Sequence, residues 1–268
     1  MLRVLKGAGS ERAFNGALIG ALALLAIFFV GIVVSLLSYT DWNTFISALL
    51  SEEIIFAIEL SLISATIATI ISILIAIPVA YAISYNEFPG KDIVDSMLDL
   101  PIVISPIALG ACLLVFFNTP VGAAINDNWK FIFAVPGIVL AQITIVCALA
   151  IRLLKSTFDS IDPRYEQVSR TLGCSKPEAF FRVTLPLAKN GLIAAGVLTW
   201  ARAMGEFGAT VTLAGATPMK TETLPIAIFL SLASANVGKA IAVIFILIVI
   251  AIAALLLLRK ITGRRHQI

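Results

Sequence analysis

Six hydrophobic stretches divide the sequence, and short polar segments separate them. Each stretch can form one membrane-spanning helix, because about 20 predominantly apolar residues cover the hydrocarbon core of a bilayer. The pattern therefore predicts an all-α, polytopic membrane protein with six transmembrane helices. The predicted spans are Gly16–Leu37, Ile54–Tyr85, Met97–Phe117, Phe133–Leu154, Gly191–Leu213 and Val237–Leu258.

Prolines and a few short segments modify this picture. Pro78 interrupts the second span near its end, while Pro101 and Pro106 predict that the third span is kinked or locally unwound. Leu224–Leu232 is too short to cross a bilayer and predicts a re-entrant or interfacial helix, whereas Asn118–Lys130 has the composition of a polar loop. The first span is expected to be a retained helix, because its apolar part is longer than the core of a signal peptide.

The longest polar interruption, Asp162–Pro186, lies between the fourth and fifth spans. Asp162 is a residue type that caps helix N-termini, and Gly173 can end that helix in a left-handed conformation. Ser175, with Glu178 three residues on, predicts a capping box for a second short helix. The stretch therefore predicts two short capped helices joined at a glycine.

The two predicted helices carry side chains at helical spacing that could face a partner. The first helix can place four residues on one side, namely Tyr165, Val168, Ser169 and Leu172. The second helix has an apolar face, and Pro186 is expected to break its pattern before the fifth span. That face consists of Phe180, Phe181 and Val183. Two interpretations fit these features, an ordinary structured loop or a docking site for another protein.

The composition supports a membrane protein and excludes several kinds of site. The 268 residues are 60% hydrophobic and 13% charged, whereas a soluble domain is about half apolar and about a quarter charged. Cys112, Cys147 and Cys174 have no paired spacing, so neither a disulfide framework nor a metal site is indicated. No P-loop sequence appears in the chain, so an ATP-driven role requires a partner that binds the nucleotide.

The distribution of lysine and arginine predicts the orientation of the chain. Six spans put both termini on one side of the membrane, together with the Asp162–Pro186 loop. That side carries 15 of the 19 lysines and arginines, and the opposite side carries three, Lys130, Lys220 and Lys239. Because cytoplasmic loops are enriched in positive charge, both termini and the loop are predicted to be cytoplasmic.

Two charged residues lie inside the fifth span. Arg202 and Glu206 are four residues apart, so they share one face of a helix. Charges within a membrane are costly and usually face a bundle interior or a water-filled cavity. Three interpretations remain open: a mutually neutralising pair that fixes packing, an anion path to which Arg202 contributes, and a contact with a partner subunit.

The Asp162–Pro186 stretch resembles the "EAA" loop of ABC importer permeases. The pattern of that loop is Glu-Ala-Ala, three residues, glycine, nine residues and Ile-x-Leu-Pro. Gly173 is followed by nine residues and then by Val183–Pro186, which matches the end of the pattern. The Glu-Ala-Ala positions hold Gln167–Ser169, and the acidic residue is Glu166, one position early. The resemblance leaves open which of Glu166 and Gln167 makes the polar contact usual in that family.

This resemblance implies a type I ABC importer permease fold in which the loop is a coupling helix. In that family the coupling helix sits in a groove on a separate ATPase, which uses ATP and Mg²⁺, while the permease binds no cofactor. The implied docking residues are Tyr165, Glu166, Gln167, Ser169, Leu172, Gly173, Phe180 and Phe181. The implied permease core is residues 54–258 with its coupling loop at 156–189, between an N-terminal part at 1–53 and a basic tail at 259–268.

A second resemblance lies in the fifth span. Trp200–Thr210 contains the Arg-x-x-Gly-Glu-Phe-Gly-Ala segment of permeases for tetrahedral oxyanions, and Asp99–Pro101 is similar to the start of their third span. The overall match is to molybdate/tungstate permeases of the ModB type, although sulfate or thiosulfate permeases share the segment. The residues implied in a translocation path or gate are Ser105, Arg202, Glu206 and Thr210. Hydrogen bonding to the helix backbone is the alternative role of the two hydroxyl residues.

Together the two resemblances imply an assembly around a non-enzymatic permease. The implied permease is a homodimer in the cell membrane, with two ABC ATPases on the cytoplasmic side and an extracytoplasmic oxyanion-binding protein. Membrane lipid surrounds it, and no nucleic acid takes part. A secondary transporter that works alone is the alternative from another class, against which stand the coupling-loop match and the lack of an obvious inverted repeat. No catalytic cluster in the sequence supports a membrane enzyme.

Overall fold

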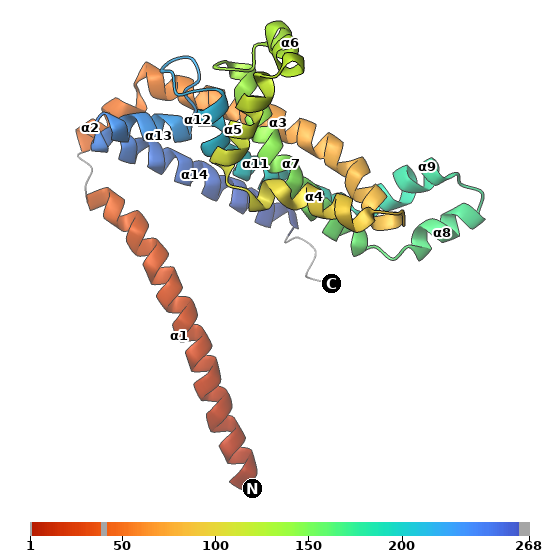
Figure 1. The fold of residues 1–268 in the computed structure, drawn as a ribbon. Coiled ribbons are helices and arrows are strands. Elements are labelled where there is room, and N and C mark those ends of the chain that lie inside the picture. The colour runs from red at the N-terminus through yellow and green to blue at the C-terminus, as the bar shows by residue number, and fades with distance from the viewer. Residues whose placement is uncertain (1, 39–41, 263–268) are drawn as a thin grey trace.

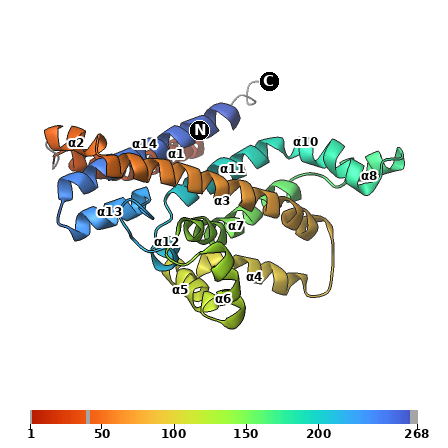
Figure 2. The same cartoon turned by 90° about the horizontal axis from the view of Figure 1, so that it is seen from above.

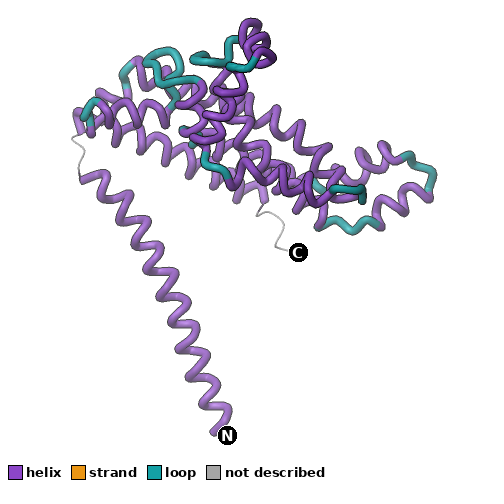
Figure 3. The backbone as a smooth tube through the Cα atoms, viewed as in Figure 1, coloured by secondary structure: helices purple, strands orange, loops and turns teal. Residues whose placement is uncertain are grey.

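The structure, a computed structural model, describes residues 2–38 and 42–262, so most of the predicted basic tail lies outside the described residues. Those residues form helices joined by loops, without a strand (Figure 3), which confirms the all-α class. The first seven helices are α1 (Leu2–Ser38), α2 (Trp42–Leu49), α3 (Glu52–Tyr85), α4 (Lys91–Val103), α5 (Pro106–Phe117), α6 (Pro120–Trp129) and α7 (Val135–Asp159). The others are α8 (Arg164–Thr171), α9 (Lys176–Ala179), the π-helix η1 (Phe180–Thr184), α10 (Leu185–Leu187), α11 (Lys189–Met204), α12 (Gly208–Leu213), α13 (Leu224–Ala233) and α14 (Val237–Thr262).

Among the described residues, four helices are long and apolar enough to cross a membrane, α1, α3, α7 and α14. The predicted third span is a broken pair, because α4 and α5 meet at 109° directly before Pro106. This confirms the predicted interruption, which falls at Pro106, while Pro101 lies inside α4. The predicted fifth span is also divided, since α11 ends at Met204 and α12 begins at Gly208. The chain is a multi-pass membrane protein, but two of its six predicted spans are not continuous helices.

The centre of the bundle is the packing of α3 against α7, and α11 lies against both (Figure 2). Small residues of α3, such as Ala57, Ala65 and Ala76, are fully buried, which allows the helices to approach closely. Large apolar residues of the same helix, such as Ile63 and Leu74, are exposed. In a protein surrounded by lipid, this distribution leaves close packing inside and bulky apolar side chains on the membrane face.

Helix α1 stands apart from the other helices (Figure 1). No residue in its most apolar 18-residue window is buried, and Phe14, Leu22 and Phe28 are among its exposed side chains. A helix that is apolar on all sides is typical of a membrane segment. The apolar surface of α1 is therefore left to lipid or to another subunit.

Some predicted boundaries are wrong, each for a local reason. Helix α3 continues through Pro78 as far as Tyr85, because a proline inside a membrane helix is tolerated where its surroundings support the backbone. The segment Asn118–Lys130, predicted as a loop, contains α6. The Thr119 hydroxyl caps that helix by accepting the Gly122 N–H at 3.2 Å. Helix α13 is short, as the sequence predicted.

Candidate functional site

Helix α8 and helix α9 form the predicted coupling loop, which extends beyond the end of the bundle (Figure 1). The Arg164 backbone N–H donates to Asp162 Oδ1 at 2.9 Å, so Asp162 caps the start of α8. Gly173 has a φ of +98°, which is the left-handed conformation predicted for it. The Cys174 N–H donates back to the Ser169 carbonyl at 3.2 Å. Residues singled out in the sequence therefore fix both ends of α8.

The capping box predicted from Ser175 and Glu178 begins α9. The Ser175 hydroxyl accepts the Glu178 backbone N–H at 3.4 Å, and the Glu178 carboxylate accepts the Ser175 N–H and hydroxyl, each at 2.9 Å. These hydrogen bonds from Ser175, followed by the charge of Arg182, hold the pKa of Glu178 below its ordinary value. The second helix of the loop thus starts at a fixed residue.

The outer face of α8 is apolar, although the helix is otherwise polar. Tyr165 is 59% exposed, Val168 is 57% exposed and Leu172 is 82% exposed. Their spacing of three and four residues puts all three on one side of the helix. We call these three residues the outer face of α8. Ser169, which was expected on the same side, is buried instead.

The inner side of α8 is fastened to the bundle by Glu166. This carboxylate is buried and accepts hydrogen bonds from the Tyr81 hydroxyl at 2.8 and 3.0 Å and from the Thr184 hydroxyl at 3.0 Å. The Ser169 hydroxyl adds a bond to the Glu166 carbonyl at 2.8 Å. Gln167 is exposed. Of the two residues between which the sequence could not choose, Glu166 makes the polar contact within the chain.

The two phenylalanines of the second helix have different surroundings. Phe180 is partly buried, with its ring centroid 4.6 Å from that of Tyr81 and 6.4 Å from that of Phe158. Phe181 is exposed. Of the two rings expected to face a partner, Phe181 is therefore exposed, whereas Phe180 packs inside the protein.

The second helix of the coupling loop continues into the membrane body (Figure 2). Elements α9, η1, α10 and α11 follow one another from Lys176 to Met204 with one non-helical residue, Ala188. Pro186 lies within α10, so the break predicted there is wrong. The wide π-helical turn η1 ends at Thr184, two residues before this proline, which has no N–H to donate to a helical bond. The coupling loop and α11 are consequently one nearly continuous helical unit.

The two broken spans meet where α12 packs on α5. A Cβ atom added at Gly208 would lie 2.9 Å from Pro106 Cβ and 3.0 Å from Ile107 N, and one added at Gly110 would lie 2.9 Å from Ala209 Cα. Glycine has no Cβ and permits this approach of the backbones. We call this contact between α5 and α12 the broken-helix joint.

The charged pair of the fifth span lies at the break between α11 and α12. Arg202 and Glu206 form an ion pair of 2.7 Å, in which the Glu206 side chain is 1% exposed and the Arg202 side chain is 38% exposed. The second oxygen of Glu206 accepts the Ala209 N–H at 3.1 Å. The pair is therefore mutually neutralising and also closes the start of α12. Arg202 retains a partly open side, which an anion could approach.

The two hydroxyl residues expected in a path have different roles. The Ser105 hydroxyl accepts the Ala108 N–H at 3.3 Å and caps α5, so it bonds to the backbone while the residue is exposed. Thr210 is fully buried, and its hydroxyl has no hydrogen-bond partner among the described residues. In this conformation Thr210 does not line an open path.

Two contacts between helices were not predicted from the sequence. Arg152 of α7 binds Asp95 of α4 at 2.7 Å and also pairs with Asp99 of that helix. The Gln142 side-chain amide of α7 donates to the Ala203 carbonyl at 3.1 Å, beside the break after α11. The aspartate of the Asp-Leu-Pro motif was a signal for the first contact, whereas a lone glutamine in an apolar span gave little sign of the second.

The described residues, 2–38 and 42–262, contain no group of three or more His, Cys, Asp or Glu side chains that could hold a metal ion. Cys112, Cys147 and Cys174 are free cysteines.

Comparison with known sequences gives a family match and several related permeases. The family described as "Binding-protein-dependent transport system inner membrane component" matches residues 72–267. The "Probable molybdenum ABC transporter permease protein" of Haloferax volcanii is 33% identical over 211 residues, which are 79% of this chain and 77% of that protein. The "Molybdate/tungstate transport system permease protein WtpB" of Thermococcus kodakarensis is 32% identical over 76% of this chain and 80% of that protein.

A sulfate permease and a solved transporter complete the comparison. The "Sulfate transport system permease protein CysW" of a Synechocystis species is 34% identical over 68% of this chain and 67% of that protein. A chain of a bacterial alginate ABC transporter, crystallised with its periplasmic protein, superposes with a TM-score of 0.77 at 20% identity, covering 98% of both chains. At this identity the superposition supports the type I permease fold.

Proposed function

The chain belongs to the family of inner membrane components of binding-protein-dependent transport systems, and from this premise we propose that it imports molybdate or tungstate with energy from a separate ATPase. The chain is a permease subunit of an ABC importer, a transporter component rather than an enzyme. What we propose beyond this is the docking of a partner ATPase, the identity of the transported oxyanion and the residues that serve each.

The observation that carries the proposal is the outer face of α8. Tyr165, Val168 and Leu172 expose large apolar surfaces on a helix that lies outside the bundle (Figure 1). An apolar helix face beyond the membrane body is costly in water unless a partner covers it. Insertion of such a face into a groove of another protein is a common mode of recognition. We assign this face to the ATPase, with Phe181 beside it.

The inner contacts of the coupling loop support a transmitting role. Glu166 ties α8 to α3 through Tyr81 and to η1 through Thr184. The nearly continuous run from α9 to α11 joins the loop to Arg202 at the break in the fifth span. When ATP binding draws two ATPase subunits together, the coupling loops of a permease homodimer would follow them. When hydrolysis separates the subunits, the loops would return.

The broken-helix joint, together with the Arg202–Glu206 pair next to it, is the proposed gate. The Arg202 side chain, partly exposed and neutralised by Glu206, can attract an anion without holding it as an unpaired charge would. Ser105, which caps the start of α5, is also exposed. Weak, multiple contacts suit transport, because a dianion that is held too tightly would not leave. Thr210 would join the path only in a conformation that uncovers it.

The proposed orientation has both termini and the coupling loop in the cytoplasm. The excess of lysine and arginine on that side supports it, and a cytosolic ATPase could reach the loop only there. An extracytoplasmic binding protein would deliver the oxyanion to the opposite face. Relatives named for molybdenum and for molybdate/tungstate support the choice of substrate, while the sulfate relative makes sulfate the second candidate.

The test is ATPase activity in reconstituted vesicles. The chain is co-expressed with its ATPase and supplied with its binding protein loaded with molybdate, tungstate or sulfate in turn. We expect stimulation by the molybdate or tungstate form and none by the sulfate form. Stimulation by the sulfate form alone would identify sulfate, and not molybdate or tungstate, as the substrate. Oxyanion transport by the chain without any ATPase would refute the proposal of an ATP-driven importer.

A further inference from the structure

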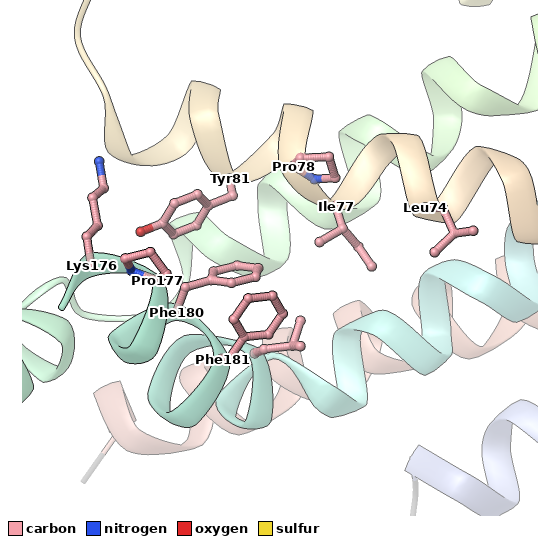
Figure 4. A pocket seen from close by; sticks show the side chains of 9 residues that line it. Leu74, Ile77, Pro78, Tyr81, Lys176, Pro177, Phe180 and Phe181 are labelled. Carbon is pink, nitrogen blue, oxygen red and sulfur yellow. The ribbon is translucent and has the colours of Figure 1, made fainter. Parts of the chain in front are cut away.

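An apolar groove runs between the end of α3 and the second helix of the coupling loop (Figure 4). Its volume is about 540 Å³. Leu74, Ile77 and Tyr81 of α3 form one wall, and Phe180 and Phe181 of η1 form the other. We call it the α3–η1 groove. Phe181, which we assigned above to the ATPase contact, also lines this groove, while the groove itself has no role above.

One cation stands at the end of this groove. Lys176 lies next to Tyr81, away from Leu74 (Figure 4). Its ammonium donates to Asn86 Oδ1 at 3.0 Å, and no carboxylate of the described residues pairs with it within 4.0 Å. Lys176 therefore brings a positive charge without a protein counter-ion to the mouth of an apolar groove.

A small polar hollow of about 240 Å³ adjoins the groove and shares Lys176 with it. Arg170 lines this hollow as a second cation, and the buried Tyr85 hydroxyl, which also lines it, has no hydrogen-bond partner among the described residues. Glu166 lines it too, but its carboxylate accepts bonds from the Tyr81 and Thr184 hydroxyls. Two cations and a free hydroxyl are the groups that bind a phosphate diester.

The position of the groove along α3 places it near the membrane surface. A helix of 34 residues is about 51 Å long, compared with about 30 Å for the hydrocarbon core, so its ends reach the headgroup region. Tyr81 and Tyr85 are aromatic residues of the kind that gather at this level. The exposed side chains of Ile67, Ile70 and Leu74 continue the apolar surface from the groove toward the middle of the span.

We propose that the α3–η1 groove binds one anionic phospholipid. An acyl chain lies between α3 and η1, and the phosphate lies at Lys176 with Arg170 on its far side. A free phosphate ion would use the polar hollow but leave the apolar groove empty, whereas a lipid fills both. Because the two walls belong to α3 and to the coupling loop, the bound lipid fastens the loop to the membrane body. The inference does not depend on which oxyanion the chain transports.

The test compares retention of two lipids with identical acyl chains. The full chain is purified in mixed micelles that contain equal amounts of phosphatidylglycerol and phosphatidylcholine, and the bound lipids are counted by native mass spectrometry. We expect preferential retention of phosphatidylglycerol. Lys176→Gln should lower this preference about five-fold, the factor that corresponds to about 1 kcal/mol for one lysine near an anionic surface.

Two further variants separate the effect of the Lys176 charge from the effect of the volume of the groove. Lys189→Gln removes the same charge from an exposed residue outside the groove and should leave the preference unchanged. Ile77→Trp fills the groove and should lower retention of both lipids, while thermal unfolding checks that the variant is folded. Equal retention of the two lipids by the wild type, or equal effects of Lys176→Gln and Lys189→Gln, would overturn the proposal. Loss of the lipid on binding of the ATPase would overturn it as well, because the groove would then be a protein contact.

Discussion

The coupling loop and the broken-helix joint both interrupt an apolar chain with polar residues, but different contacts hold them. In the coupling loop most hydrogen bonds are local, as between Ser175 and Glu178, and apolar residues such as Leu172 remain outside. In the broken-helix joint, glycines bring two backbones together, and next to it Gln142 of α7 bonds to the end of α11. The coupling loop therefore leaves an apolar surface exposed, whereas the joint holds two helix backbones in close contact.

The largest effect is expected at the charged pair next to the joint. Glu206→Ala leaves Arg202 without its partner and the Ala209 N–H without its acceptor. We expect the free energy of unfolding in mixed micelles to fall by about 3 kcal/mol. The matched control is Glu53→Ala, which removes the partner of Lys239 from a more exposed pair and should cost no more than about 1 kcal/mol. Equal losses in the two variants would remove the distinction between joint and surface.

The next effect concerns the glycines. Gly208→Ala puts a methyl group 2.9 Å from Pro106 Cβ and 3.0 Å from Ile107 N, so we expect a loss of about 2 kcal/mol in unfolding free energy from overpacking. Gly196→Ala in α11 is the matched control, because its added methyl group meets nothing within 4 Å. That change should stabilise the helix by about 0.5–1 kcal/mol. The same substitution is thus expected to have opposite signs at the two positions, and a shared sign would refute the close contact.

A change on the coupling loop should alter partner binding and not folding. Leu172→Asp places a charge on the outer face of α8, where the side chain is largely exposed. We expect the affinity for the ATPase, measured by co-purification and titration, to fall by at least about ten-fold, which is about 1.4 kcal/mol. The unfolding free energy should change by less than about 0.5 kcal/mol.

The control for this prediction is Asn190→Asp, which adds the same charge to an exposed residue of α11 outside the coupling loop. It should leave ATPase binding unchanged. If Leu172→Asp bound the ATPase as the wild type does, the outer face of α8 would not be the docking surface.

A smaller, local effect is expected at the capping box. Ser175→Ala removes the hydroxyl that accepts the Glu178 N–H and donates to its carboxylate. Hydrogen exchange at the Glu178 amide should become about five-fold faster, in line with the typical effect of losing a helix cap, while amides in α7 keep their rates. An unchanged rate at Glu178 would mean that η1 alone holds α9 in place.

Lowering the pH should have the smallest effect, and it should act on the same capping box of Ser175 and Glu178. The pKa of Glu178 is lowered in the folded loop by its bonds from Ser175 and by Arg182. A lowered pKa means that the stabilisation is present above the ordinary value of about 4.3 and is lost as pH falls through the folded value. Exchange at the Glu178 amide, corrected for its intrinsic pH dependence, should therefore rise below about pH 4, and the rise should be absent in Ser175→Ala.

The coupling loop could be predicted closely because its structure depends on neighbours in sequence. Asp162, Gly173, Ser175 and Glu178 take the positions that local capping rules give them. The same rules did not separate Phe180, which packs on Tyr81 of α3, from Phe181, which is exposed. That difference depends on a helix about 100 residues earlier in the chain, and the local spacing of apolar residues does not predict such a contact.

The membrane body shows the same division. Hydrophobic runs predicted α3, α7 and α14 well, since a spanning helix depends on composition and length. They did not predict the break in the fifth span, where Gly205 follows α11 and Glu206 closes the start of α12. Nor did they predict that Arg152 would pair with Asp95 and Asp99 of α4. Both features are satisfied by contacts between helices, which a single hydropathy pattern does not contain.

The nearly continuous helix from Lys176 to Met204 has a geometric consequence. At about 1.5 Å per residue it is about 43 Å long, and Ala188 divides it into arms of about 18 and 24 Å. A pivot of about 5° at Ala188 would move the two ends by about 2 Å in opposite directions. Helix α9 and the break after α11 would then behave as the two ends of a balanced lever. A small rotation outside the membrane would become a shift large enough to open a contact that glycines keep closed.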